Sequence, residues 1–99
     1  MLNPEFKAMI RLIETADAGD IPSLETAHAT LVAEINRLVE PDVYTEGAIE
    51  GVTSSLVAFI ASINQADTLP HFTVARHRYN AREALWALHD ELRRQSESS

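Results

Sequence analysis

Residues 75–94 read ARHRYNAREALWALHDELRR, and their apolar members recur with the period of an α-helix. Plotted at about 100° per residue, one side of this helix carries an inward stripe of Val74, Ala81, Leu85, Leu88 and Leu92. The helix breaker Leu69-Pro70 precedes the segment, and Thr73 is the expected N-cap. We therefore predict an amphipathic helix over residues 74–95, followed by a frayed polar tail at residues 96–99.

The rest of the chain divides into three further helical segments, which Gly and Pro separate. The apolar residues between these breakers repeat with helical period, and no alternating pattern typical of a strand occurs. The predicted helices cover about residues 4–18, 23–39 and 44–66. Short connections favour antiparallel neighbours, so the sequence predicts an all-α fold, a four-helix and largely antiparallel bundle. Residues 1–95 would form its single domain.

The composition is typical of a small protein that folds without cross-links. A chain of 99 residues has the usual length of one domain and buries roughly two-thirds of its unfolded surface. It contains no cysteine, which excludes disulfides, thiolate metal sites and cysteine nucleophiles. Neither a signal-peptide pattern nor an apolar run of about 18 residues occurs, so we expect a cytoplasmic protein outside the membrane. Seven arginines and one lysine suggest a bacterial source.

The net charge of −7 is unevenly distributed along the chain. Residues 1–70 carry eleven acidic and three basic side chains, whereas residues 71–99 carry four acidic and five basic ones. An acidic protein repels phosphate backbones and attracts basic partners. We therefore expect a basic protein partner rather than a nucleic acid. Glu40, Asp42, Glu46 and Glu50 lie close together in the acidic part of the sequence, so a partner that docks on residues 1–70 should be basic.

The predicted third helix is unusual because residues 51–66 carry no charged side chain. Opposite its large apolar face lies a stripe of small residues that includes Gly47, Gly51, Ser55, Ala58 and Ser62. A solvated stripe normally carries Lys, Glu or Gln. Glycine costs about 0.8–1 kcal/mol relative to alanine inside a helix, so two glycines suggest a closely approaching backbone. The stripe is either a thinly polar solvated face or a contact, with the same bundle or with a second copy in self-association.

The helix predicted over residues 74–95 also carries a candidate partner-binding face. Five residues lie on one side of it, beside the inward leucines: Tyr79, Arg82, Trp86, His89 and Arg93. Trp, Tyr and Arg are the residues that most often anchor protein interfaces. Arg82 and Trp86 lie four positions apart, a spacing that favours stacking of the guanidinium on the indole. The simplest alternative is an amphipathic helix whose Trp86 covers the edge of the core.

Two other functions of this face stay open. Arg82 and His89 are separated by six residues, which resembles the loose Arg-x(4–6)-His motif of HEPN-type ribonucleases. That resemblance implies His89 as the general acid–base and Arg82 as the group that stabilises phosphate charge. Bases stacked on Tyr79 and Trp86 would instead make the protein a binder of single-stranded nucleic acid.

His28 lies among apolar residues of the helix predicted over residues 23–39, so we expect a packed histidine with one hydrogen-bonded nitrogen. Glu25 and His28 match the Glu-x-x-His element of di-iron bundles, but that site needs a second such element, which the sequence lacks. No phosphate loop, nucleophile motif or paired metal ligands occur.

The sequence therefore predicts a non-enzymatic protein-interaction module without metal or cofactor, which self-associates as a homodimer. A bacterial or phage regulator, an antitoxin or immunity-type inhibitor and a secretion chaperone are the settings that fit a small acidic binding protein. The surface used for self-association is either the small-residue stripe of the third helix or the aromatic face of the fourth.

Overall fold

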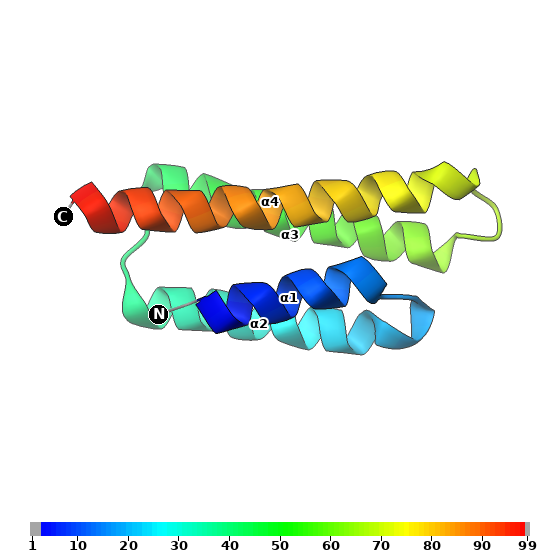
Figure 1. Ribbon diagram of the computed structural model, residues 1–99, viewed down its shortest axis with the longest axis horizontal. Helices are drawn as coiled ribbons and strands as arrows, with labels where there is room; N and C mark the ends of the chain where they lie inside the picture. Colours follow the sequence, from blue (N-terminus) through cyan, green and yellow to red (C-terminus); the bar gives the residue numbers. More distant parts are fainter. Residues whose placement is uncertain (1–2, 99) are drawn as a thin grey trace.

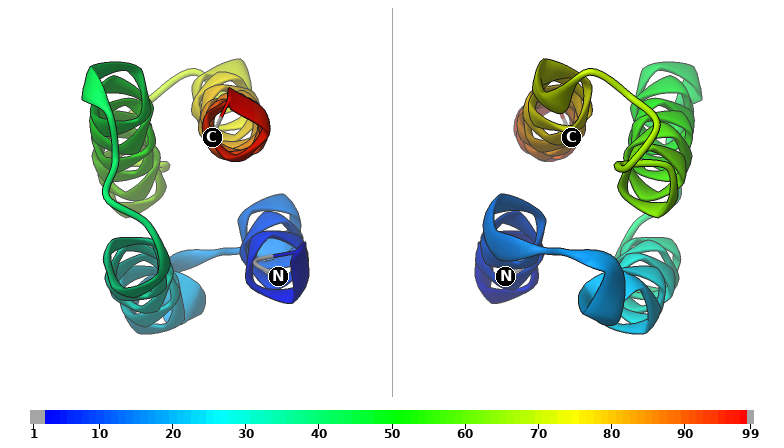
Figure 2. Two further views of the ribbon diagram at one scale, coloured as in Figure 1. Left: turned by 90° about the vertical axis from the view of Figure 1, so that its left-hand side faces the viewer. Right: turned by 90° about the vertical axis from the view of Figure 1, so that its right-hand side faces the viewer.

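The computed structural model describes residues 3–98 and forms an all-α, antiparallel four-helix bundle. The elements are α1 (Asn3–Thr15), a short 3-10 turn η1 (Ala18–Asp20), α2 (Ile21–Leu38), α3 (Val43–Asn64) and α4 (His71–Ser98). The helices run alternately up and down, so the two ends of the chain lie at the same end of the bundle (Figure 1). Viewed end-on, the helices occupy the corners of a square in the order α1, α2, α3, α4 (Figure 2). The predicted fold class is confirmed.

The core is formed by apolar side chains from all four helices. Its buried members are Phe6, Met9, Ile10, Ile13, Ala16, Leu24, Leu31, Ile35, Val52, Leu56, Phe59, Ile63, Ala81, Leu85 and Leu88. The stripe predicted on α4 therefore faces inward, although Val74 and Leu92 at its two ends are half-buried against the core. Helices α3 and α4 are longer than α1 and α2, and their connection extends beyond the shorter pair (Figure 1).

Both ends of α4 differ from the prediction. The helix begins at His71, and the backbone N–H of Thr73 donates to the Pro70 carbonyl at 2.9 Å, so Thr73 lies in the first turn and is not the N-cap. Proline lacks an N–H and has a fixed φ, which suits the start of a helix. The helix also continues to Ser98, beyond its predicted end at residue 95, so the polar residues 96–98 are helical. Position 99 lies outside the described residues.

The first helix ends earlier than predicted because an acidic turn follows it. α1 stops at Thr15, where the prediction placed its end at residue 18. The Oδ1 of Asp17 accepts from the Gly19 N–H, and the Oδ2 of Asp20 accepts from the Asp17 N–H, both at 3.0 Å. This reciprocal capping box starts η1, from which α2 continues at Ile21.

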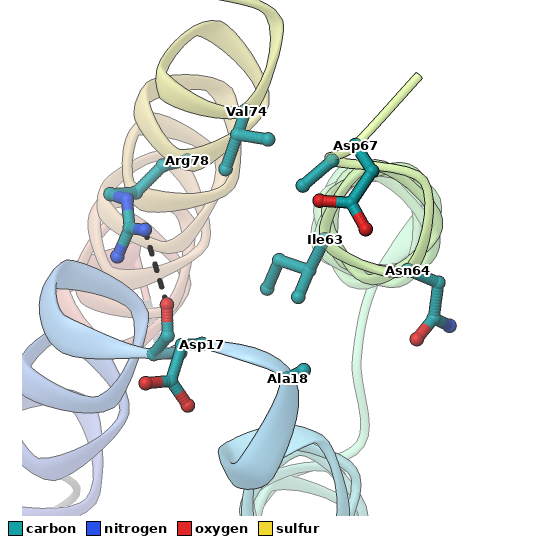
Figure 3. A pocket seen from close by; sticks show the side chains of 9 residues that line it. Asp17, Ala18, Ile63, Asn64, Asp67, Val74 and Arg78 are labelled. Carbon is teal, nitrogen blue, oxygen red and sulfur yellow. Dashed lines mark hydrogen bonds between the residues drawn. The ribbon is translucent and has the colours of Figure 1, made fainter. Parts of the chain in front are cut away.

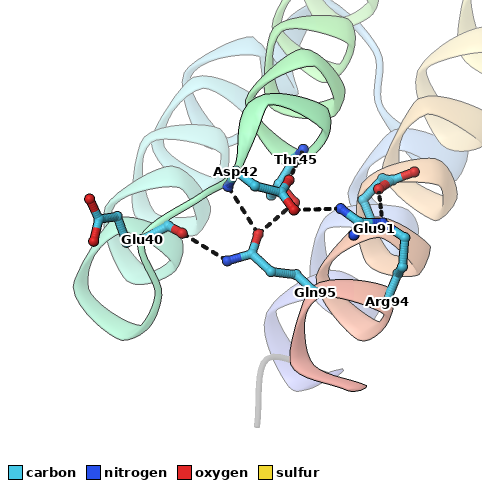
Figure 4. Close-up of polar contacts among 6 residues, drawn as sticks. All are labelled: Glu40, Asp42, Thr45, Glu91, Arg94 and Gln95. Atoms are coloured by element: carbon cyan, nitrogen blue, oxygen red, sulfur yellow. Dashed lines mark hydrogen bonds and ion pairs between the residues drawn. The ribbon is translucent and has the colours of Figure 1, made fainter. Parts of the chain in front are cut away.

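The C-terminal part of α4 is hydrogen-bonded to the connection between α2 and α3 (Figure 4). The Oε1 of Gln95 accepts from the Asp42 N–H at 3.1 Å and from the Thr45 hydroxyl at 2.8 Å. Its Nε2 donates to the Glu40 carbonyl at 2.7 Å. One side chain therefore satisfies three polar groups in the α2–α3 connection and the first turn of α3, which lie 50 to 55 residues away in the sequence.

An ion pair reinforces this contact. Arg94 donates to Asp42 Oδ2 and to Glu91 Oε2, both at 2.7 Å, and its guanidinium lies 5.4 Å from the centre of the Tyr44 ring. The hydrogen bond from Arg94, together with one from the Thr45 N–H, lowers the pKa of Asp42 to about 2. The carboxylate of Asp42 is therefore bound to groups of the same chain, which distinguishes it from the exposed Glu40, Glu46 and Glu50.

Candidate protein-interaction site

An exposed line of aromatic residues runs along α4. Phe72, Tyr79 and Trp86 are 56%, 54% and 44% exposed. They are spaced by seven residues, and positions seven apart on a helix differ in direction by only about 20°. Arg93, also exposed, continues the same line. These four residues are called the α4 ridge below.

Phe72 is the member of the ridge that the sequence does not indicate as a partner-binding residue. It lies before residue 74, where the sequence predicts that the helix begins. The seven-residue spacing between Phe72 and Tyr79 was the signal that would have found it. Tyr79, Trp86 and Arg93, which the sequence indicated as partner-binding residues, are all exposed on this helix.

The flank of the ridge that faces α1 carries Arg82. Its Nη1 lies 3.9 Å from Oε1 of Glu14, and its guanidinium lies 5.5 Å from the centre of the Tyr79 ring. The predicted stacking of Arg82 on Trp86 is therefore wrong, because the guanidinium turns toward the preceding turn of α4 and toward α1. A hollow of about 320 Å³, lined by Glu14, Ala75, Arg78, Tyr79 and Arg82, lies beside it.

His89 lies on the same flank, one heptad beyond Arg82. Its ring makes edge-to-face contacts with Phe6 of α1 at 5.4 Å and with Trp86 at 5.6 Å between ring centres. Its side chain is 26% exposed, and Nδ1 lies 3.6 Å from Oδ1 of Asp90. The contacts of Arg82 and of His89 are thus with different neighbours, an arrangement that does not favour the pairing implied by the ribonuclease motif.

The opposite flank of the ridge, called the outer flank below, is mainly acidic. It carries Glu83, Asp90 and Glu97 at seven-residue spacing, and all three are exposed. Arg76 occupies the equivalent position one heptad before Glu83. The Tyr79 hydroxyl donates to Glu83 Oε1 at 3.4 Å, which holds the phenol ring over this flank. The ridge therefore separates a flank with Arg82 and His89 from a flank of carboxylates.

Arg78 contributes to the fold through contacts with α1 and α3. Its Nη1 and Nη2 donate to the carbonyls of Ile13 and Ala16, at 2.7 and 3.1 Å, and its guanidinium lies 5.1 Å from the centre of the Phe59 ring. Arginine at this position satisfies carbonyls at the C-terminal end of α1. Figure 3 shows Arg78 extending from α4 to the end of α1, at the edge of a hollow between the α1–α2 turn and the end of α3. This hollow has a volume of about 400 Å³.

The small-residue stripe of α3 is exposed only in part. Gly47 and Gly51 are exposed, and no atom of another helix lies within 4 Å of a Cβ built on either of them. Ser55 and Ala58 are half-buried. Ser62 is 3% exposed and donates its hydroxyl to the Phe59 carbonyl at 2.7 Å, so its assignment to the self-association surface is wrong.

The two glycines are therefore not explained by packing within the bundle. The same-bundle alternative requires atoms close to Gly47 and Gly51, and the space beside both is open. The two alternatives that remain for this part of α3 are a face exposed to solvent and a contact with a second copy. The stripe becomes more buried toward the C-terminal end of α3, and Ser62 at its end lies in the core.

Helix α3 is also, within residues 3–98, a helix long and apolar enough to cross a membrane by length and composition. Core helices of soluble proteins pass the same test. Val52, Leu56 and Phe59 of α3 are buried in the bundle, while 28% of its apolar 18-residue stretch is buried overall. Length and composition alone therefore do not place this helix in a membrane.

His28 is half-buried between α2 and α3, and its Nε2 lies 3.0 Å from Oγ1 of Thr53. Burial lowers the pKa of His28, because removing the ring from water disfavours its charged form. The expectation of a packed histidine with one hydrogen-bonded nitrogen is confirmed. Glu25, its partner in the di-iron motif, is exposed, and the described residues contain no group of three His, Cys, Asp or Glu that could hold a metal ion.

Comparison with protein-family models, curated proteins and solved structures gave no match for this chain. A proposal for its function therefore rests on its own exposed residues. Among these, the α4 ridge and its two flanks combine exposed aromatic area with defined charges.

Proposed function

We propose that the protein is a non-enzymatic interaction module that binds another protein through the α4 ridge and also self-associates. The carrying observation is the exposure of Phe72, Tyr79 and Trp86 along a single line. Large aromatic side chains contribute the most contact area per residue to protein interfaces, with about 150–250 Å² buried for each. Arg82 and Arg93 beside them are of the other type that is enriched at interface centres.

The acidic side of the molecule supports a basic partner. Glu40, Glu46 and Glu50 are exposed around the start of α3, while Asp42 is occupied by Arg94. A basic partner that docks there would be steered by the negative potential, so its association would slow as salt concentration rises. We propose a cytoplasmic setting outside the membrane, as a bacterial or phage regulator, an antitoxin or immunity-type inhibitor, or a secretion chaperone.

The test is a comparison of Trp86→Ala with the matched variant Asn80→Ala, which changes an exposed residue on another side of α4. Sedimentation velocity measures self-association, and chemical cross-linking in native cells followed by mass spectrometry identifies foreign partners. We expect Trp86→Ala to weaken binding by about thirtyfold or more, because truncation of a central aromatic anchor costs about 2 kcal/mol or more. Asn80→Ala should bind as the wild type does.

Equal binding by both variants would contradict the proposal. Cleavage of RNA by the purified protein, lost on His89→Ala, would replace it with the ribonuclease function. Strongly salt-dependent binding of single-stranded oligonucleotides would replace it with nucleic-acid binding.

A further inference from the structure

The two flanks of the α4 ridge carry opposite charges, and this asymmetry restricts how a second copy can bind. Arg82 lies on the flank facing α1, where its contacts with Glu14 and Tyr79 place it. Glu83 and Asp90 lie on the outer flank. Between the two flanks, Phe72, Tyr79, Trp86 and Arg93 span about 32 Å at 1.5 Å per residue. The ridge therefore supplies one seam position per heptad, with aromatic residues along most of its length, Arg93 at its end and charges at its edges.

Two-fold symmetry allows α4 to pair with its own copy in two directions. In an antiparallel pair the symmetry axis is perpendicular to the helices, and each flank meets the same flank of the other copy. Arg82 would then face the flank that carries Arg82 of the second copy. Glu83 would face the flank that carries Glu83 of the second copy. In a parallel pair the axis runs along the helices, and each flank meets the opposite flank of the other copy. Like charges across an interface are unfavourable, so the flanks favour the parallel pair.

We propose that two copies of the chain associate through the α4 ridge with their α4 helices parallel, so that Arg82 of each copy pairs with Glu83 of the other. The inference rests on the proposed function and specifies its self-association. It assigns the dimer contact to α4 rather than to the small-residue stripe of α3.

The contacts that the ridge and its flanks make within one chain do not prevent their side chains from binding a second copy. The 3.9 Å between Arg82 and Glu14 exceeds hydrogen-bond distance, so the guanidinium retains donors for a second carboxylate. In the parallel pair, residues of the seam lie opposite their own copies, and Tyr79 and Trp86 would make aromatic pairs with the same residues of the second copy. Arg93, at the end of the seam, faces Arg93 of the second copy, and Asp90 of the opposing outer flank, level with it to within one helical turn, offsets this repulsion.

Cysteine cross-linking tests the direction of the pair, since the chain contains no cysteine of its own. In the parallel pair, two copies of position 79 face each other, as do two copies of position 86, within the distance of about 7 Å between Cα atoms that a disulfide spans. Tyr79→Cys and Trp86→Cys should therefore each form a covalent dimer alone, under mild oxidation at micromolar concentration. An antiparallel pair can bring only one of the two positions opposite its own copy. Ala87→Cys, exposed on another side of α4, should not. Cross-linking of a Tyr79→Cys and Trp86→Cys mixture, with neither variant cross-linking alone, would show an antiparallel pair and overturn the proposal.

Charge reversal provides a second test that keeps the aromatic seam intact. In the parallel pair, position 82 of each copy faces position 83 of the other. Arg82→Glu therefore places two carboxylates opposite each other at both of these contacts, and Glu83→Arg places two guanidiniums there. We expect each variant to dimerise about tenfold or more weakly than the wild type, as measured by sedimentation equilibrium. A mixture of the two variants should form heterodimers, and the double variant Arg82→Glu/Glu83→Arg should regain the wild-type dissociation constant within about threefold.

These outcomes separate the inference from the proposed function. If Trp86→Ala disrupts binding but the charge variants dimerise as the wild type does, the parallel pair is wrong and the interaction module stands. If the wild type stays monomeric at millimolar concentration, the inference fails, and the proposed function then depends on a foreign partner that Trp86→Ala releases. If Gly51→Leu dissociates the dimer and the charge variants do not, the contact lies on α3 and the inference fails.

Discussion

His28 shows how a single polar residue in a helical interface makes stability depend on pH. The Thr53 hydroxyl donates its one hydrogen to the Ile49 carbonyl at 3.2 Å, so its oxygen accepts from Nε2 of His28. Burial lowers the pKa of His28 in the folded protein below the ordinary value of about 6.5. The unfolded chain then binds the proton more readily, so stability is complete above about pH 6.5 and falls as the pH decreases.

We expect His28→Leu to remove this contribution. Urea unfolding at pH 7.5 and pH 5 gives the change in free energy of unfolding with pH for the wild type and for the variant. The difference between these two changes is the contribution of His28, because the other histidines contribute equally to both proteins. The wild type should lose more stability than the variant over that interval. Thr53 keeps its bond to Ile49, so the variant leaves no unpaired donor at neutral pH. An equal loss in both proteins would contradict the assigned role of His28.

Gln95 is a residue whose importance no local pattern indicates. Gln95→Ala removes three hydrogen bonds from the α2–α3 connection and leaves the hydroxyl of the buried Thr45 without this acceptor. We expect a loss of about 1–3 kcal/mol in the free energy of unfolding, measured with urea, because buried polar groups become unpaired. Asn80→Ala, at an exposed position of the same helix, should not lose stability. Equal stability of the two variants would show that water replaces Gln95 without cost.

At the scale of single helices, the sequence predicted where helices occur better than where they end. Apolar periodicity located all four helices, because burial of a stripe depends on residues close together in the chain. The ends depend on distant contacts or on the chemistry of one turn. Arg78 holds the end of α1 from another helix, and the early start of α4 at His71 placed Phe72 on the ridge. Charge and aromatic type indicated Tyr79, Trp86 and Arg93, while the contacts of Arg82 with Glu14 and Tyr79 required the fold.

The glycines of α3 allow an element-scale prediction. A Cβ at Gly51 would meet no atom within 4 Å, so Gly51→Ala adds helix propensity without a clash. We expect the free energy of unfolding to rise by about 0.5–1 kcal/mol, measured by urea or thermal unfolding. The same increase is expected for Gly47→Ala, whose surroundings are equally open. A decrease in stability, accompanied by weaker self-association, would indicate that another backbone lies against this face in solution.

At the scale of the whole molecule, net charge gives self-association and partner binding opposite dependences on salt. Each copy carries a net charge of −7, and the bundle is 20 × 16 Å across its two shorter dimensions. The facing charges of two copies side by side, whose long axes lie about 20 Å apart, are therefore mostly within one Debye length of about 30 Å at 0.01 M salt. At physiological salt, where this length is about 8 Å, most of them are screened from one another.

We therefore expect dimerisation to strengthen by on the order of tenfold between about 0.01 M and 0.15 M salt, because the long-range repulsion between two acidic copies is screened. The pairs between Arg82 and Glu83 act at contact distance and are weakened less over the same interval. Sedimentation equilibrium across the salt series measures this dependence, and association of a basic partner would show the opposite trend. A dimer that weakens steadily with added salt would mean that ion pairs, rather than the aromatic seam of the ridge, supply most of its stability.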